Sequence, residues 1–195
     1  MKRLFVLATA LLLAACSSMP AWVPGSGWKT LVDGDKGLEN FNRLGDANWR
    51  AEGGAIVADK ASQNSYLVTK NSYKDFQIRA EFWADTTTNS GIFLRAQDPK
   101  KIGADTAYEV NIFDQRKDAT YRTGAIVGVA KPMAQIDAGN RWSTYHIEAH
   151  GRRLVVKLNG QTTVDVEDDK LAAGPIGLQY AAGQVKFRSV RIRRQ

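Results

Sequence analysis

Apolar and polar residues alternate in a series of short segments beyond residue 75. In the segment 76–82, which reads FQIRAEF, every second residue is apolar and the residues between are polar or charged. Successive side chains of a β-strand point to opposite faces, so this pattern predicts a strand that buries one face. The same alternation predicts strands at 91–95, 108–112, 145–149, 154–158 and 185–192, and shorter apolar runs predict strands at 49–52, 55–58, 65–69, 124–130, 161–166 and 174–180.

Turn-forming residues separate these runs. Gly53-Gly54 and Asn159-Gly160 are typical of tight β-hairpins, and His150-Gly151-Arg152 indicates another turn. A shift of the apolar spacing within 185–192 indicates a β-bulge. No stretch of a dozen residues beyond residue 15 has a good helical period. The pattern therefore predicts an all-β chain, folded as an antiparallel two-sheet β-sandwich of the jelly-roll kind.

The first sixteen residues, MKRLFVLATALLLAAC, have a different character. Two basic residues precede the segment 4–15, which is apolar except for Thr9. This run is shorter than the ~20 residues needed to span a bilayer, and it is typical of a signal peptide. It ends in Leu13-Ala14-Ala15-Cys16, which resembles the bacterial lipobox, where the Cys is acylated and becomes the first mature residue.

This resemblance divides the chain into three parts. We expect a lipoprotein signal peptide at 1–15, a lipid anchor on Cys16, a Pro- and Gly-containing tether at 16–27 and a single domain at 28–195. Ser17 after the Cys, rather than Asp, favours a cell-envelope location in the outer membrane, facing the periplasm. The alternative is a plain secretory signal cleaved near Ala15, with an incidental Cys.

Composition and charge narrow the classes of protein. Apolar residues make up 44% and charged residues 24% of the 195 residues, which excludes wholesale disorder. The single Cys excludes an internal disulfide. Loss of Lys2 and Arg3 with the signal peptide lowers the formal charge from +7 to +5. The Arg-rich final strand is suited to anionic lipid or polysaccharide, or to an edge strand that discourages aggregation, and we do not expect nucleic acid as a partner.

Aromatic and polar residues occupy the predicted outer positions of the middle strands. If the aliphatic positions of 76–82, 91–95 and 108–112 face the core, the opposite positions hold Gln77, Arg79, Glu81, Trp83, Phe93, Arg95, Glu109, Asn111 and Phe113. Aromatic rings beside planar polar groups are typical of carbohydrate-binding surfaces. The alternative is an ordinary solvated face with a few covered aromatic side chains.

Two acidic segments contain residue types that carry chemistry in other proteins. Glu109 and Asn111 share a strand face, whereas Asp114 points away from it unless a bulge intervenes. His146, Glu148 and His150 also share a face, but a strand spreads them over ~13 Å, too far for one ion to contact all three. A solvated face explains them better, and we expect neither a metal nor a cofactor.

The domain as a whole resembles the 3-keto-disaccharide hydrolase family, which has a concanavalin A-like (laminin-G-like) jelly roll. The resemblance is carried by ordered strings over nearly the whole domain, above all Asn89-Ser-Gly-Ile-Phe-Leu-Arg95 and Gly174-Pro-Ile-Gly-Leu-Gln179. Tyr108-Glu-Val-Asn-Ile112 and Val185-Lys-Phe-Arg-Ser-Val-Arg-Ile192 are among the others. It implies a carbohydrate ligand, and cleavage of 3-keto-disaccharides or related glycosides in the cell envelope.

The family pattern also implies a site on the concave sheet. The candidate catalytic residues are Glu109 as a base, Arg95 as an oxyanion stabiliser and Asp114 beside them; the candidate substrate-binding residues are Asn111, Trp83, Phe93, Phe113 and Gln179. Relatives often carry His shortly after the Gly-Leu-Gln string, whereas this chain continues Tyr180-Ala-Ala-Gly183. That departure favours the alternative of a non-catalytic carbohydrate-binding lipoprotein. A structural or assembly role for the fold is a third alternative.

Overall fold

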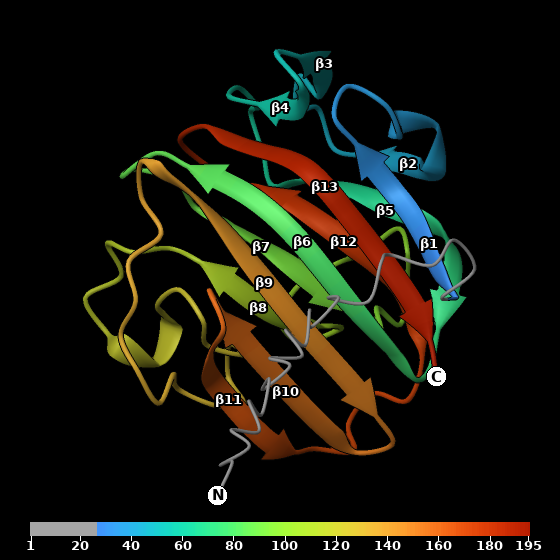
Figure 1. Cartoon of the computed structure of the whole chain (residues 1–195), viewed down its shortest axis with the longest axis vertical. Coiled ribbons are helices and arrows are strands. Elements are labelled where there is room, and N and C mark those ends of the chain that lie inside the picture. The colour runs from blue at the N-terminus through green and yellow to red at the C-terminus, as the bar shows by residue number, and fades with distance from the viewer. Residues whose placement is uncertain (1–26) are drawn as a thin grey trace, which may run out of the picture.

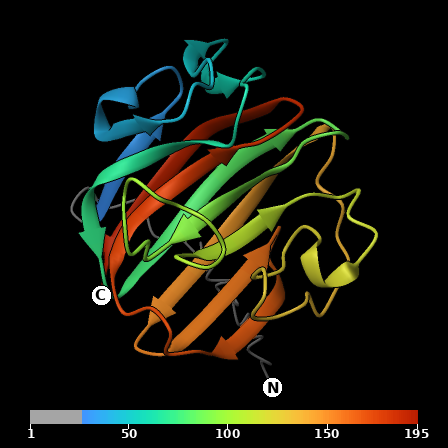
Figure 2. The ribbon, with the colours of Figure 1, turned by 180° about the vertical axis from the view of Figure 1, so that it is seen from behind.

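The structure is a computed structural model that describes residues 27–195. The expected signal peptide, Cys16 and all of the tether except Gly27 lie outside the described residues. Two stacked antiparallel sheets form the domain (Figures 1 and 2). Within 27–195, no helix has the length and apolar character needed to cross a bilayer.

The larger sheet has eight strands in the order β11-β10-β9-β6-β13-β4-β3, and β1 also pairs with β13. Its strands are β1 (Trp28–Asp33), β3 (Arg50–Glu52), β4 (Ala55–Ala58), β6 (Phe76–Ala84), β9 (Arg141–His150), β10 (Arg153–Leu158), β11 (Gln161–Glu167) and β13 (Val185–Arg194). The smaller sheet has the order β2-β5-β12-β7-β8, with β2 (Phe41–Leu44), β5 (Ser65–Tyr73), β7 (Ser90–Leu94), β8 (Tyr108–Ile112) and β12 (Gly174–Tyr180).

The predicted sandwich is confirmed, with differences in individual strands. The bulge in the last strand is present as a register shift between Phe187 and Ser189 against β6. The predicted strand at 124–130 was wrong, because this segment forms only isolated bridges, at Ile126. β1 and β2 were not predicted. Their buried residues come in pairs or singly rather than in strict alternation.

The structure has hairpin turns at the predicted positions. Gly53-Gly54 joins β3 to β4, and Asn159-Gly160 joins β10 to β11. All four residues have positive φ, between 50° and 85°. This is the conformation that the hairpin turns require, and Asn and Gly adopt it with little strain.

The hydrophobic core lies between the two sheets. Every second residue of β6 is fully buried, from Phe76 to Ala84, as the alternation predicted. The rings of Phe82 and Tyr145 stack with their centroids 5.0 Å apart. Burial of the inner face fixes the register of each strand, because a slip of one residue would expose it.

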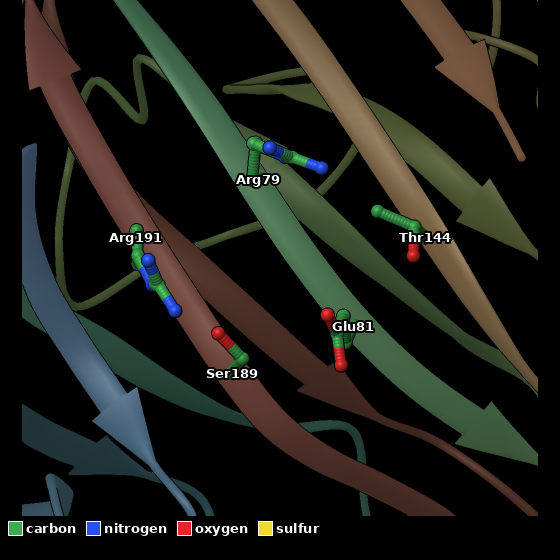
Figure 3. A pocket seen from close by; sticks show the side chains of 5 residues that line it. All are labelled: Arg79, Glu81, Thr144, Ser189 and Arg191. Carbon is green, nitrogen blue, oxygen red and sulfur yellow. The ribbon is translucent and has the colours of Figure 1, made fainter. Parts of the chain in front are cut away.

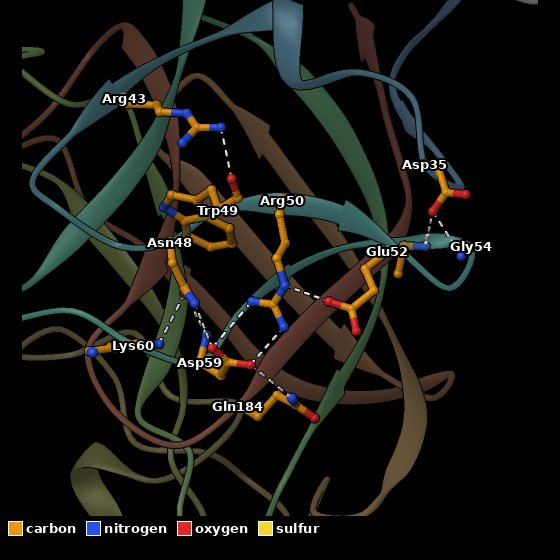
Figure 4. A network of polar contacts seen from close by, with 11 residues as sticks. Asp35, Arg43, Asn48, Trp49, Arg50, Glu52, Gly54, Asp59, Lys60 and Gln184 are labelled. Atoms are coloured by element: carbon orange, nitrogen blue, oxygen red, sulfur yellow. Dashed lines mark hydrogen bonds and ion pairs between the residues drawn. The ribbon is translucent and has the colours of Figure 1, made fainter.

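A polar network fastens the β3–β4 hairpin to the residue that precedes β13 (Figure 4). Arg50 pairs with Glu52 within its own strand and with Asp59 just beyond β4, where its Nη2 lies 2.8 Å from the carboxylate. The side chain of Gln184 donates to the same Asp59 carboxylate at 3.3 Å. Side-chain contacts therefore attach the hairpin to the rest of the sheet, in addition to the few backbone hydrogen bonds between β4 and β13.

Arg95, the residue directly after β7, has a position that contradicts its predicted role. Its φ is +52°, which turns the side chain away from the outer face, and the residue is 1% exposed. The guanidinium donates to the backbone carbonyls of Lys74, Gly151 and Leu171 at 2.7–3.0 Å, and it lies 3.4 Å from Asp75. Arg95 therefore joins three connections at one end of the sandwich and cannot reach a ligand on the outer face.

We predict that Arg95→Met lowers the free energy of unfolding by about 3–5 kcal/mol, because buried carbonyl groups lose their donors. Arg95→Lys should recover only part of this, since an ammonium group cannot reproduce the planar fork. Urea unfolding measures both. Arg152→Met is the control, because Arg152 is exposed and its ion pair with Asp169 is long, at 3.9 Å. Equal stability of Arg95→Met and the control would contradict this role.

Candidate functional site

The expected aromatic and polar face is divided between the two sheets. β6 belongs to the eight-stranded sheet, whereas β7 and β8 belong to the five-stranded sheet. Trp83 therefore lies on the opposite side of the sandwich from Glu109, where its ring stacks under Lys186 Nζ at 4.6 Å. The prediction that Trp83 and Glu109 serve one ligand site was wrong.

The outer face of the five-stranded sheet collects Glu109, Asn111 and Gln179. In the register of β7 and β8, Phe93 pairs with Glu109 and Gly91 pairs with Asn111. Phe93 is also on this face, but it is 1% exposed and packs edge-on against Tyr66 with centroids 5.2 Å apart. Phe93 therefore packs beneath the surface of this face. The prediction that its ring offers an exposed platform for a sugar was wrong.

A pocket of about 110 Å³ opens beside Glu109. β8 contributes Glu109 and Asn111, and Asn89 precedes β7. The remaining lining comes from the segment after β8, which contains the short 3₁₀ turn η2 (Ala119–Tyr121): Phe113, Arg116, Tyr121 and Val127. Of the expected binding residues, Asn111 and Phe113 therefore share a pocket with Glu109.

Gly91 lets Gln179 and Glu109 approach the same point on the sheet. A Cβ atom at residue 91 would lie 3.1 Å from the carbonyl oxygen of Val110, 3.5 Å from Glu109 Cγ and 3.6 Å from Gln179 Oε1. The absence of a side chain at Gly91 thus leaves a shallow gap between the carboxyl and the amide. Gln179 extends the group formed by Glu109 and Asn111 onto β12.

Two buried amide oxygens at this face lack partners. Asn111 Nδ2 donates to the carbonyl of Tyr121, but Asn111 Oδ1 and Gln179 Oε1 have no hydrogen-bond donor in the described part of the chain. An unsatisfied buried acceptor costs about 1–3 kcal/mol, so it calls for an explanation. A ligand rich in hydroxyl groups would supply the missing donors.

The carboxyl group of Glu109 is electrostatically unusual. Burial raises its pKa to about 7, and the nearby positive charge of Arg116 opposes the rise. Burial also raises the pKa of the neighbouring Tyr66 hydroxyl. Glu109 is therefore divided between its acid and base forms at neutral pH, as suits a general base.

Asp114 does not join this group as a free carboxylate. Its Oδ2 accepts hydrogen bonds from the backbone N–H groups of Ala138 and Gly139 at 2.8 and 2.7 Å, and Oδ1 accepts one from the Thr123 hydroxyl. These contacts hold the loop before β9 against the end of β8. The expectation of a catalytic Asp114 is replaced by a structural role, because its oxygens are already engaged.

Tyr145 ties the wall of the pocket to the core. From its buried position on β9, its hydroxyl donates to the carbonyl of Asn111 at 2.6 Å and accepts from the N–H of Gly124 at 2.8 Å. The backbone around Asn111 and the segment after η2 are therefore held by one core side chain.

Arg116, rather than Arg95, is the cation beside Glu109 in this pocket. Its guanidinium lies over the rings of Phe113 and Tyr121, 5.7 and 5.4 Å from their centroids. Within residues 27–195 it forms no ion pair. The sequence analysis missed Arg116, Tyr121, Asn89, Val127 and Tyr66. The aromatic and Arg residues clustered at 113–121, outside any predicted strand, were the one available signal.

The predicted His146, Glu148 and His150 face is on the eight-stranded sheet, away from this pocket. His146 Nε2 lies 3.7 Å from Glu148. No group of three or more His, Cys, Asp or Glu side chains among the described residues could hold a metal ion.

A family model for the 3-keto-alpha-glucoside-1,2-lyase-like domain matches residues 27–193, nearly all of the described chain. The chain belongs to this family. The match extends over both sheets, so the 3-keto-glucoside lyase-like domain includes the Glu109 pocket and the outer face of the eight-stranded sheet. No curated protein matches the chain.

Solved structures with the same architecture include two from Parabacteroides distasonis, each described as a proposed glycosyl hydrolase. One is 24% identical, with a TM-score of 0.69, and the match covers 86% of this chain and 99% of that one. The other is 18% identical, with a TM-score of 0.69 and coverage of 87% and 89%. The carbohydrate-binding module CBM66 of Bacillus subtilis is 18% identical, with a TM-score of 0.58 and coverage of 86% and 95%. At these identities the likeness shows that the lyase-like domain shares their fold.

The raised pKa of Glu109 makes stability depend on pH in a defined direction. Between pH 4.5 and about 7 the folded protein keeps a proton that the unfolded chain has released, so the free energy of unfolding falls as the pH rises. One pKa unit corresponds to about 1.4 kcal/mol, so the raised pKa of Glu109 lowers the free energy of unfolding by up to about 3 kcal/mol once the pH exceeds about 7. Below pH 4.5 both states are protonated and the penalty is absent.

We therefore predict that Glu109→Gln gains stability over the wild type as the pH rises, by up to about 3 kcal/mol at about pH 8. Urea unfolding of both proteins between about pH 4 and about pH 8 measures the difference. Parallel curves over this range would show that Glu109 titrates at its ordinary pKa.

Proposed function

We propose that the protein cleaves the glycosidic bond of 3-keto-glycosides by elimination, with Glu109 as the base. The observation that carries this proposal is a carboxyl group with a pKa of about 7 in a pocket that Asn111 also lines, where the amide oxygen of Asn111 lacks a donor. Membership of the 3-keto-alpha-glucoside-1,2-lyase-like family supports the substrate class. The carbohydrate-binding neighbours support a carbohydrate ligand.

The reaction follows from the acidity of the substrate. A carbonyl at C3 acidifies the proton on C2, and the Glu109 carboxylate removes it. The electron pair of the C2–H bond then forms the C1–C2 double bond, while the C1–oxygen bond breaks and the departing oxygen takes a proton from water. Addition of water across the new double bond would complete a net hydrolysis.

Other residues of the pocket, and Gln179 on the same sheet face, bind and orient the sugar. Asn111 Oδ1 and Gln179 Oε1 accept hydrogen bonds from its hydroxyl groups. Arg116 provides a positive charge near the enolate that develops as the C2 proton leaves. Its effect on the pKa of Glu109 indicates that the two side chains interact.

The first test is release of the aglycone from a 3-keto-glucoside by the purified protein. Loss of a general base costs about 10²- to 10⁴-fold, so Glu109→Gln should lower kcat by that factor. The wild-type kcat should rise with pH through about 7, because the base form of Glu109 is then populated. Glu167→Gln, an exposed change on β11, is the matched control and should leave turnover unchanged.

Two outcomes would contradict the proposal. Saturable sugar binding without turnover would exclude the enzyme, and turnover that is unaffected by Glu109→Gln would exclude Glu109 as the base. A smaller loss in Arg116→Gln, seen in kcat rather than in KM, would support its role in stabilising the enolate.

The second candidate is a non-catalytic carbohydrate-binding protein. It is favoured by Tyr180-Ala-Ala-Gly183, which lacks the His that the family resemblance implies there, and by the shared fold with CBM66. On this alternative Glu109, Asn111 and Gln179 only hold sugar hydroxyl groups. Glu109→Gln would then weaken binding without changing any reaction.

We further propose that the protein is anchored in the cell envelope through a lipid on Cys16, facing the periplasm from the outer membrane. The lipobox-like end of the signal sequence supports this location. Because a thioether-linked lipid requires the Cys sulfur, Cys16→Ser should move the protein from the membrane fraction to the soluble fraction. Fractionation followed by immunoblotting measures this. An unchanged distribution would overturn the anchor.

A further inference from the structure

A row of basic residues crosses the outer face of the eight-stranded sheet. The strand registers place Arg191 of β13 opposite Arg79 of β6, Arg79 opposite His146 of β9, and His146 opposite Lys157 of β10. Neighbouring strands are about 4.8 Å apart, so the row is about 14 Å wide. This face is on the opposite side of the sandwich from Glu109.

The row is unfavourable for the folded domain taken alone. Like charges directly opposite each other on a sheet are destabilising. Among residues 27–195, Arg79, Arg191 and Lys157 have neither an ion pair nor a side-chain hydrogen bond that would offset the repulsion. Burial first, and then the charges of Arg79, Lys157 and Arg193, lower the pKa of His146, whereas Glu148 raises it. The arrangement therefore favours an anionic partner.

A pocket of about 120 Å³ lies between the two arginines (Figure 3). Arg79 and Arg191 flank it, and Ser189 and Thr144 contribute hydroxyl groups. Glu81 also lines it, but Arg188 Nε holds its carboxylate at 2.6 Å. Two guanidinium groups beside hydroxyl donors are the chemistry that binds a phosphate group.

Tryptophan residues lie on the same face. Trp83 and Trp142 are paired across β6 and β9, and Trp142 is 37% exposed. Lys186 stacks over Trp83 at 4.6 Å and Arg188 stacks over Trp142 at 4.3 Å. Trp beside Lys and Arg is the combination enriched where proteins meet the headgroup region of a membrane.

We propose that the outer face of the eight-stranded sheet docks onto anionic phospholipid, with a lipid phosphate between Arg79 and Arg191. The basic row faces the negative surface and the tryptophan pair lies in the headgroup region. The reaction at Glu109 is not needed for this step. The choice of lipid over another polyanion rests on the proposed anchor. Residues 16–27 can span at most about 40 Å, so a lipid on Cys16 would keep the domain close to the membrane. These residues lead into β1, which pairs with β13, the strand that carries Arg191.

The test uses the chain from residue 20 onward, without lipid, because every strand and the core lie within the described residues. Its binding to phosphatidylcholine vesicles with and without phosphatidylglycerol is measured by co-sedimentation. We expect binding only with phosphatidylglycerol, and loss of binding as salt rises from about 0.1 M to about 1 M. Each basic residue near an anionic leaflet contributes about fivefold, so the double variant Arg79→Gln/Arg191→Gln should bind about 25-fold more weakly.

A matched control separates this site from net charge. Lys100→Gln/Lys101→Gln removes the same charge from the exposed connection between β7 and β8, two strands of the five-stranded sheet. This variant should change vesicle binding less than about twofold. The Tm of the arginine double variant should be unchanged or higher, because a repulsive pair is removed. Competition by inorganic phosphate would identify the phosphate group as the part that is bound.

Three outcomes would overturn the proposal. These are equal binding by the arginine double variant and the wild type, equal weakening by the lysine control, and binding to a soluble anionic polysaccharide such as dextran sulfate without binding to the vesicles. Because sugar turnover is measured separately, a failure here leaves the assignment of Glu109 intact.

Discussion

The packing of two sheets against each other is the constraint on which the other features depend. A strand that buries one face must present every second side chain on the outside, so burial of Tyr108, Val110 and Ile112 obliges Glu109 and Asn111 to face outwards. The same rule sends Arg79 outwards between the buried Ile78 and Ala80. Both proposed sites are therefore consequences of how the core is filled.

The alternation of residues was enough to predict the sandwich, most strands and the turns, because each of these is set by local burial and local backbone preference. It also identified Glu109 and Asn111 as outward-facing, whereas Gln179 was predicted from the family resemblance. Strand pairing is not local, and this is where the prediction was wrong. Trp83 and Glu109 follow the same pattern, but β6 and β8 belong to different sheets, so their outer faces point in opposite directions.

Single-residue backbone geometry explains the other differences. Arg95 continues the alternation of β7 in sequence, but its positive φ turns the guanidinium toward three carbonyl groups. Phe93 does point outwards, yet the connection after β7 covers it with Ala96, Ala107 and Ile102. Arg116 belongs to the segment between strands, for which a period of two makes no prediction.

In the Glu109 pocket, the backbone around Asn111 is held by hydrogen bonds, whereas the cation Arg116 is exposed. Tyr145 and Asp114 fix the backbone around Asn111 and the following loop. The raised pKa of Glu109 follows from burial of its carboxyl group beside this wall. Arg116, by contrast, is exposed and held by ring stacking rather than by an ion pair, so it can adjust to the charge of a bound ligand.

The outer face with Arg79 and the outer face with Glu109 lie on opposite sides of the sandwich. Because they belong to opposite sheets, about 10 Å of core separates them, and a surface that contacts one cannot cover the other. A domain that rests on a membrane through the Arg79 face therefore leaves the Glu109 pocket open to glycosides in solution. The two proposals are therefore compatible, because a pocket on the docking face would be closed by the membrane itself.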